Sequence, residues 1–168
     1  MSTKEHKSRA PRHVRVAVIT ISTSRSLAED KSGQWIKKHV EKEGHTVVYH
    51  QVVPDNASMI QATLKEVING PGPDAVLLTG GTGIAFEDVT IEAVRPLFTK
   101  ELTSFGPLFA MLSYEEIDSA ALLSRATAGL IEKTIVFCMP GSQKACKLAC
   151  NALIFPELGH LSKHVREG

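Results

Sequence analysis

Two aspartates in this 168-residue chain, Asp55 and Asp88, stand where they could hold a metal ion. Each follows a stretch that is typical of a strand, and Asp88 comes soon after the glycine-rich run 79–83 (TGGTG). Three glycines within four residues let the backbone turn sharply and bring its N–H groups close to an anion. Carboxylates combined with main-chain amides indicate a site for Mg²⁺ and phosphate.

The glycine-rich run matches neither of two common phosphate-binding motifs. It lacks the Gly-Lys-Ser/Thr that completes a P-loop. Phe86 stands where a dinucleotide-binding fingerprint would place its third glycine. A glycine-rich loop after a strand is in some proteins only a tight turn, and Asp55 could equally begin a turn or cap a helix. Both interpretations of each feature stay open at this point.

Two further polar segments also follow predicted strands. Residues 22–26 (STSRS) combine four hydroxyls with the guanidinium of Arg25, and they could bind phosphate or serve as ordinary loop residues. Pro140, Gly141 and Ser142 precede a helix whose first turn contains Lys144. A lysine there opposes the helix dipole, which favours a role in anion binding over a role in stability.

An alternation of strands and helices positions these segments. We expect strands at residues 14–21, 46–53, 75–78, 126–131 and 134–139. We expect a helix that Asp30 or Ser32 caps and that Gly44 ends, and further helices at 59–68, 91–98, 108–117, 145–154 and 155–165, with a break at 103–107 and a short helix or turn at 120–125. The helix at 59–68 would be capped by Asn56 or Ser58.

This order of elements predicts an α/β fold, a three-layer αβα sandwich around a mainly parallel central sheet. The strands at 126–131 and 134–139 would be an antiparallel addition to that sheet. The loops after the first, second, third and last strands should then gather at one edge, where ligands bind in such folds. The polar segments described above all lie in those loops.

Composition is typical of one domain from a reducing compartment. Residues 1–12 carry four basic side chains against one acidic, so we predict a flexible basic tail before a single domain at 13–168. The net charge of +1 gives no reason to expect nucleic acid or a membrane as a partner, and no apolar run is long enough to span a bilayer. Three cysteines and no signal-peptide core indicate the cytoplasm.

In this order the motifs resemble the MoaB/MogA family of molybdenum-cofactor biosynthesis, the molybdopterin adenylyltransferases. The resemblance covers residues 14–161. It rests on segments 78–83 (LTGGTG) with 88–90 (DVT), 105–106 (FG) with 111–117 (MLSYEEI), 123–126 (LSRA) with 128–129 (AG), and 139–142 (MPGS) with 144–145 (KA). The segment 111–117 is closer to the MoaB branch.

The resemblance implies a molybdopterin-binding-like fold and the Mg²⁺-dependent transfer of AMP from ATP to the terminal phosphate of molybdopterin. Asp55 and Asp88 match the family's two essential aspartates, as catalytic residues and as Mg²⁺ ligands. Trimers or hexamers, and a downstream molybdenum-insertion protein as partner, are implied as well. The predicted substrate-binding residues are Ser22, Gly80, Gly81, Thr82, Gly83, Ser113, Glu116, Ser124, Arg125, Pro140, Gly141, Ser142 and Lys144.

The chain departs from the family at one place. Many members carry a basic residue just before the second aspartate, whereas Phe86 and Glu87 precede Asp88 here. Glu87 could repel the phosphates of ATP, point away, or help to hold the metal. The alternative function is therefore a non-catalytic molybdopterin-binding carrier or scaffold. A phospho-acceptor signalling domain, suggested by Asp55 at a strand end, is a weaker alternative, because Asp30 is the only other early acidic candidate.

Overall fold

The central sheet is built on four parallel strands with mostly apolar side chains. In the computed structural model, which describes residues 13–168, these strands are β1 (Arg15–Ile21), β2 (Thr46–Val53), β3 (Ala75–Thr79) and β6 (Thr134–Met139). All residues of β3 and β6 are buried, and β1 is exposed only at its first residue. Strands that are apolar on both faces are typical of a sheet covered on both sides.

Two shorter strands extend the sheet beyond β6. β5 (Thr127–Ile131) pairs antiparallel with β6, and β4 (Lys100–Glu101) pairs antiparallel with β5. The order across the sheet is β2-β1-β3-β6-β5-β4. The predicted antiparallel addition is therefore confirmed for β5 only, because β6 is parallel to β3 and belongs to the parallel part of the sheet. The two-residue β4 was not predicted.

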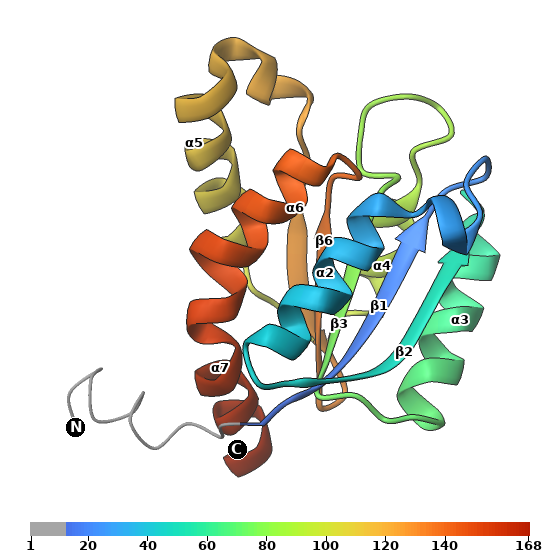
Figure 1. Cartoon of the computed structure of the whole chain (residues 1–168), viewed down its shortest axis with the longest axis vertical. Helices are drawn as coiled ribbons and strands as arrows, with labels where there is room; N and C mark the ends of the chain where they lie inside the picture. The colour runs from blue at the N-terminus through green and yellow to red at the C-terminus, as the bar shows by residue number, and fades with distance from the viewer. Residues whose placement is uncertain (1–12) are drawn as a thin grey trace.

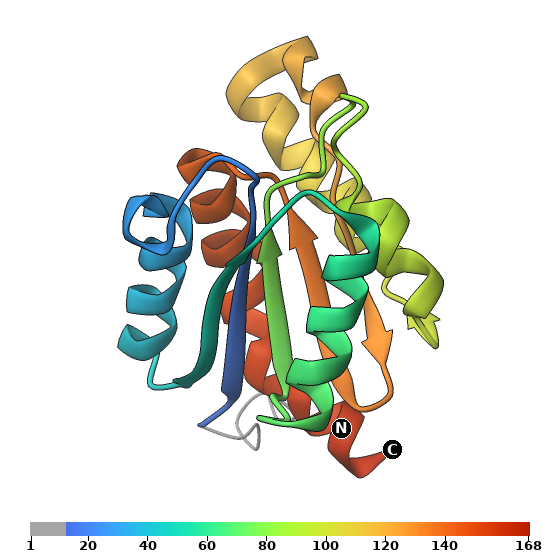
Figure 2. The same cartoon turned by 90° about the vertical axis from the view of Figure 1, so that its right-hand side faces the viewer.

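Helices cover both faces of the sheet, which confirms the predicted three-layer α/β sandwich (Figures 1 and 2). On one face lie α2 (Lys31–Lys42), α5 (Phe105–Ile117), α6 (Gln143–Ala149) and α7 (Phe155–Glu167), and on the other lie α3 (Ala57–Asn69) and α4 (Thr90–Val94). The remaining segments are the short η1 (Leu27–Glu29), η2 (Arg95–Leu97) and η3 (Asp118–Leu123), and the π-helical η4 (Cys150–Ile154). No helix among residues 13–168 combines the length and apolar character needed to cross a membrane.

Alternate residues of β1 contribute to two separate hydrophobic cores. Val16 and Val18 belong to the core shared with α2, α6 and α7, whereas Ala17 and Ile19 belong to the core shared with α3 and α4. This division follows from the two-residue repeat of a strand. Because helices pack on both faces, the sheet is held in place, and the positions at which its strands end are fixed.

Two side chains determine where helices begin after β1 and β2. Asp30 accepts a hydrogen bond from the Gly33 amide at the start of α2, and Asn56 accepts one from the Met59 amide at the start of α3. Aspartate and asparagine are among the residues that favour this position. The prediction of Asp30 and Asn56 as capping candidates is confirmed.

The predicted break at residues 103–107 is wrong in its second half, because α5 begins at Phe105. Pro107 lies in the first helical turn, where a missing N–H costs no helical hydrogen bond. Gly106 fits closely there, since a Cβ on it would lie 2.7 Å from the Ala126 carbonyl oxygen. Local sequence could not show that close approach to a segment from elsewhere in the chain.

Two other predicted helix boundaries also change. The predicted helix 91–98 is divided into α4 and η2, and Pro96 at the start of η2 removes an amide that would continue α4. The predicted helices 145–154 and 155–165 form one continuous rod, joined by η4. The predicted basic tail, residues 1–12, lies outside the described residues.

Candidate functional site

The four parallel strands end together at one edge of the sheet. Ile21 pairs with Val53, Thr20 pairs with Thr79, and Thr79 pairs in turn with Met139. The chain that follows each strand therefore leaves the sheet at the same edge, which is the upper edge in Figure 1. The predicted convergence of these four loops is confirmed.

A cavity of about 570 Å³ lies at this edge and receives residues from all four loops. Asp55 and Asp88 both line it. Its wall also includes residues 21–25, 80–83, 87, 123–124 and 140–141. We call it the aspartate cavity.

Asp55 is held in place by the loop after β1. Its Oδ2 accepts hydrogen bonds from the amide and from the hydroxyl of Thr23, each 2.9 Å long. The Thr23 hydroxyl oxygen in turn accepts a hydrogen bond of 3.1 Å from the Asp55 amide. Oδ1 lies against the glycine-rich loop, because a Cβ on Gly81 would be 3.1 Å from it. Asp55 thus connects three of the converging loops.

The glycine-rich loop makes a turn that glycine adopts most easily. Gly80 and Gly81 have φ angles of +101° and +66°. Thr90 closes the turn, since its hydroxyl donates to the Gly80 carbonyl at 2.8 Å and its amide donates to the Gly81 carbonyl at 2.9 Å. A Cβ on Gly81 would lie 2.3 Å from the Thr90 hydroxyl oxygen, so a side chain is excluded by space as well as by φ.

Asp88 is positioned by its own loop. Its Oδ2 accepts a hydrogen bond from the Ala85 amide, and its amide donates to the Ala85 carbonyl, both at 3.0 Å. The carboxylate packs over Gly83, where a Cβ would lie 2.5 Å from Oδ2. The absent side chain of Gly83 therefore leaves the space that the carboxylate occupies. Glu87 lines the cavity too, and adds a third acidic residue to its wall.

Arg125 is not among the residues that line the aspartate cavity. Its Nε donates to the carbonyl oxygens of Thr82 and Gly83, at 2.8 and 3.1 Å, and Nη1 pairs with Glu92 of α4. Hydrogen bonding to Glu92 raises the pKa of Arg125 against the effect of partial burial, and the charges of Glu92 and Asp88 raise it further. The guanidinium is thus engaged with protein groups, and its predicted role in substrate binding stays a prediction.

The loop after β6 is tied to two neighbouring elements. The Thr79 hydroxyl donates to the Pro140 carbonyl at 2.9 Å, and the Ser32 hydroxyl of α2 donates to the Gly141 carbonyl at 2.8 Å. Ser142 caps α6, because its hydroxyl oxygen accepts a 3.1 Å hydrogen bond from an amide of the first turn. The Ser142 hydroxyl oxygen thus already caps the helix, and the role of this loop in anion binding stays a prediction.

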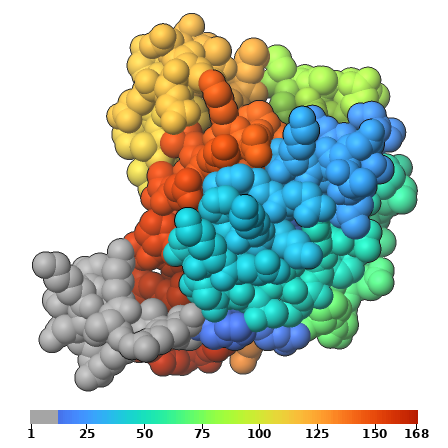
Figure 3. Space-filling model, viewed as in Figure 1, coloured from blue at the N-terminus to red at the C-terminus, as the bar shows by residue number. Residues whose placement is uncertain are grey.

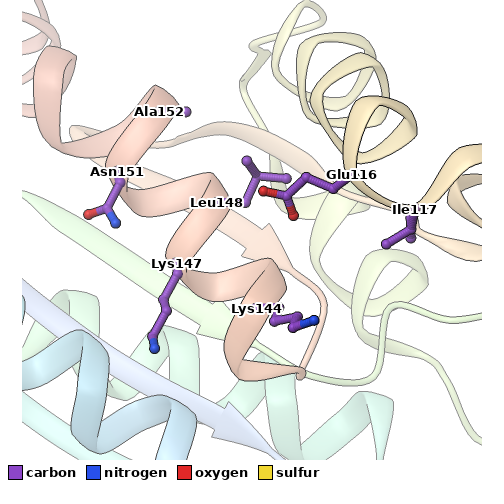
Figure 4. Close-up of a pocket in the computed structure, with 7 residues that line it drawn as sticks. All are labelled: Glu116, Ile117, Lys144, Lys147, Leu148, Asn151 and Ala152. Carbon is purple, nitrogen blue, oxygen red and sulfur yellow. The ribbon is translucent and has the colours of Figure 1, made fainter.

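Two further cavities extend from the aspartate cavity along α5. One of about 140 Å³ shares Ser124 and Pro140 with it and is also lined by Ser113 and Glu116. The next, of about 540 Å³ between α5 and α6, shares Glu116 and Lys144 with the small one. Figure 4 shows Glu116 extending from α5 toward α6, and Lys144 at the first turn of α6. We call the two together the α5–α6 groove.

The groups on the wall of the aspartate cavity suit Mg²⁺ together with phosphate. Among residues 13–168, no three side chains of His, Cys, Asp or Glu converge on one metal position. Mg²⁺ is usually held by one or two carboxylates, and waters and substrate phosphates complete its shell. Asp55 and Asp88 match that pattern, and the amides of the loop 80–83 are suited to phosphate oxygens.

Sequence reasoning missed the partners that hold these groups. In the sequence Thr23 is one of four hydroxyls in the run 22–26, and in the structure its amide and its hydroxyl both bind Asp55. Glu92 has no sequence feature near it that points to Arg125. The hydroxyl-rich run 22–26 is a signal in the sequence that could have indicated Thr23 as a partner of Asp55. The sequence carries no comparable signal for the pairing of Glu92 with Arg125.

A buried polar cluster below the loop after β1 was missed as well. Asp30 has no exposed surface, accepts a 2.6 Å hydrogen bond from the Thr20 hydroxyl and lies 3.1 Å from His50 Nε2. Burial by itself raises the pKa of the Asp30 carboxyl, but hydrogen bonds from His50, Thr20 and the Gly33 amide outweigh burial and lower it. The cluster joins β1, β2 and α2 beneath the site.

One family and several known proteins are similar to the chain. Residues 17–160 match the family described as probable molybdopterin binding domain. The chain is 50% identical over 168 residues to molybdenum cofactor biosynthesis protein B of Bacillus subtilis, covering 99% of each. It is 38% identical to a probable molybdopterin adenylyltransferase of Methanocaldococcus jannaschii, over 94% of this chain and 97% of the relative. The crystal structure of the tungsten cofactor synthesizing protein MoaB from Pyrococcus furiosus is similar with a TM-score of 0.84 and 43% identity, over 94% of this chain and 99% of that one.

Proposed function

The chain belongs to the MoaB/MogA family of molybdenum-cofactor biosynthesis proteins, and we propose that it is a molybdopterin adenylyltransferase. The reaction transfers AMP from ATP to the terminal phosphate of molybdopterin and releases pyrophosphate. The observation that carries the proposal is that Asp55 and Asp88 line one cavity with the glycine-rich loop. Two carboxylates beside main-chain amides suit the alignment of two phosphate-bearing substrates.

In this mechanism the aspartate cavity receives both sets of phosphates. A terminal oxygen of the acceptor phosphate attacks the α-phosphorus of ATP, and the bond between that phosphorus and the pyrophosphate oxygen breaks. The attacking phosphate is already ionised, so no side chain has to remove a proton from it. Asp55 and Asp88 would hold Mg²⁺, which supplies positive charge to the departing pyrophosphate. The amides of the loop 80–83 hold the acceptor phosphate in the aspartate cavity, and Ser142 faces the same ligand from the small adjoining cavity.

We assign the pterin end of molybdopterin to the α5–α6 groove. The groove adjoins the aspartate cavity through Ser124 and Pro140, so one elongated ligand can occupy both. The Glu116 carboxylate can accept hydrogen bonds from ring N–H groups, and Lys144 provides a cation beside the phosphate. Ser113, almost fully buried on α5, lies on the wall between the two ends.

Turnover with molybdopterin, ATP and Mg²⁺ tests the proposal. Asp88→Asn keeps the shape of the side chain and removes its charge, and we expect AMP transfer to fall about 100- to 1,000-fold. Asp118→Asn is the matched control, because Asp118 is exposed beyond α5 and has a φ of 51°, which asparagine tolerates. Wild-type turnover in Asp88→Asn would contradict the proposed mechanism.

A non-catalytic molybdopterin carrier is the second candidate, and one observation favours it. Glu87 lines the cavity where the phosphates of ATP would lie, and a carboxylate there repels them. Calorimetry and turnover separate the two functions. Binding of molybdopterin without binding of Mg-ATP or AMP transfer supports the carrier, whereas measurable transfer excludes it.

The assembly we propose is a homo-oligomer, either a trimer or a hexamer. α5 and η3 project from the body of the molecule, as Figure 3 shows. Exposed apolar side chains gathered on one such segment are typical of an interaction surface. Size-exclusion chromatography with light scattering distinguishes monomer, trimer and hexamer. The apolar residues, with exposed fractions between 43% and 85%, are Leu108, Met111, Tyr114, Ile117, Leu122 and Leu123.

The cytoplasm is the compartment that we propose for the reaction. Cys138, Cys146 and Cys150 are all free thiols and all buried, as expected in a reducing compartment. The adenylylated product would pass to a downstream molybdenum-insertion protein. Measuring whether such a protein accelerates product release would test that transfer.

A further inference from the structure

We propose that Glu92 and Arg125 form a brace that positions Asp88, although neither residue lines the aspartate cavity. Glu92 lies in α4, just after the glycine-rich loop, and Arg125 lies between η3 and β5. Figure 2 shows the loop between β3 and α4 rising beside the segment that leads from η3 to β5. The inference rests on the proposed function, and it assigns two positioning residues to that site.

The contacts of the brace come from one guanidinium. Nε and Nη2 of Arg125 both donate to the Gly83 carbonyl, at 3.1 and 2.8 Å, and Nε also donates to the Thr82 carbonyl at 2.8 Å. Nη1 and Nη2 donate to the two carboxylate oxygens of Glu92, at 2.5 and 3.2 Å. A planar fork that binds carbonyls on one side and a carboxylate on the other has a fixed orientation.

Fixing these carbonyls fixes the surface on which Asp88 rests. The C=O and N–H of a trans peptide point in opposite directions, so holding the Thr82 and Gly83 carbonyls also sets the direction of the amides that follow them. The Asp88 carboxylate packs on Gly83, close enough that a Cβ there would lie 2.5 Å from Oδ2. A shift of Gly83 is therefore transmitted directly to the carboxylate.

Glu92 has a second effect, through charge. Arg125 lies close enough to Asp88 that, after Glu92, the charge of Asp88 contributes to raising the pKa of Arg125. Without Glu92 the guanidinium would keep its carbonyl contacts, but its positive charge would act on Asp88 with no counter-charge beside it. Glu92 thus balances the charge of Arg125 and leaves the Asp88 carboxylate available for a cation. The side chains of Arg125 and Glu92 are 34% and 53% exposed, and an ion pair that exposed adds little stability to the fold. Its role is therefore better explained by the orientation that it gives to Arg125.

The test compares Glu92→Gln, Arg125→Lys and the double variant. We expect Glu92→Gln to raise the Mg²⁺ concentration for half-maximal turnover about fivefold, which corresponds to one charge interaction near water. The KM for molybdopterin should change less than the Mg²⁺ dependence does, because the pterin end lies in the α5–α6 groove. Arg125→Lys should also raise the Mg²⁺ concentration for half-maximal turnover. The double variant should raise it no more than the stronger single variant does, because each single change already breaks the Glu92–Arg125 brace.

Glu101→Gln is the matched control, since Glu101 also pairs with an arginine, Arg95, away from the aspartate cavity. Hydrogen exchange of residues 80–90 gives a readout that does not need turnover. Faster exchange there in Glu92→Gln than in Glu101→Gln supports the brace even if AMP transfer is absent from the wild type. Equal exchange in both variants overturns it. A raised KM for molybdopterin in Arg125→Lys, with normal Mg²⁺ dependence, also overturns it and makes Arg125 a substrate contact.

Discussion

Replacing Gly83 by alanine should displace a catalytic carboxylate without removing it. A Cβ at this position would lie 2.5 Å from Asp88 Oδ2, whereas ordinary van der Waals contact begins near 3.4 Å. Gly83 is not among the glycines with positive φ, so alanine brings no left-handed strain of its own. The backbone can accept the side chain, and the Asp88 carboxylate has to move away by roughly 1 Å.

The expected magnitude follows from that displacement. A misplacement of about 1 Å at a reacting group typically costs about 100-fold in rate. Removing the charge altogether, as in Asp88→Asn, costs about 100- to 1,000-fold. Gly83→Ala should therefore lose about 100-fold in kcat and no more than Asp88→Asn loses. The loss in kcat should exceed any rise in the KM for molybdopterin, because neither Gly83 nor Asp88 lines the α5–α6 groove that holds the pterin end.

Steady-state turnover and thermal unfolding together decide this prediction. Gly70→Ala is the control, because a Cβ there would also meet a close oxygen, the Glu66 carbonyl at 3.0 Å, but at the end of α3 away from the cavity. Gly70→Ala should keep its turnover whatever it does to the melting temperature. A folded Gly83→Ala protein with wild-type kcat would refute the argument that Gly83 makes room for the Asp88 carboxylate.

Three other changes test the surroundings of the site. Thr23→Val removes a hydroxyl bound to Asp55, and turnover should fall about tenfold for a lost hydrogen bond to a charged group; an unchanged rate would show that the tie is unimportant. Glu87→Arg should lower the KM for ATP by up to about tenfold, with an effect that shrinks as salt is added; the absence of any shift would mean that Glu87 does not face the nucleotide. Asp30→Asn should lower the free energy of unfolding at pH 7 by roughly 1–3 kcal/mol. Because the folded-state pKa of Asp30 is below its ordinary value of 3.8, the stability advantage of the wild type over Asp30→Asn is complete above pH 3.8 and is lost as the pH falls through the folded-state pKa. Urea unfolding at several pH values measures this advantage. An advantage that already disappears near neutral pH would contradict the argument.

The sheet and the convergence of its loops could be predicted because both follow from local patterns. Apolar runs such as 75–78 indicate strands that are buried on both faces, and their alternation with helices predicts a parallel sheet. Once the sheet is parallel, its strand ends must share an edge. The placement of Asp55 and Asp88 in one cavity therefore needed only the order of elements and the positions of two residues.

The partners of those residues could not be predicted, because they depend on distances that no local pattern contains. Arg125 belongs to the motif 123–126, which predicts substrate contact, yet its observed partners are Glu92 and carbonyls of the glycine-rich loop. His50 lies in the middle of β2, where its spacing indicates only a strand residue, and its contact with Asp30 arises from the pairing of β1 with β2. The early start of α5 likewise depends on Ala126, which is distant in sequence.

The loops of the site are tied to one another as well as to the sheet, and this decides how the site should respond to change. Thr23 binds Asp55, Ser32 binds the loop after β6, and Arg125 binds the glycine-rich loop. Asp55 and Asp88 come from different loops, so their relative position depends on such ties and not on either loop alone. A site that acts by alignment and charge needs that relative position to be fixed before the substrates arrive. Breaking a single tie should therefore alter the dependence of turnover on Mg²⁺ well before it alters the stability of the fold.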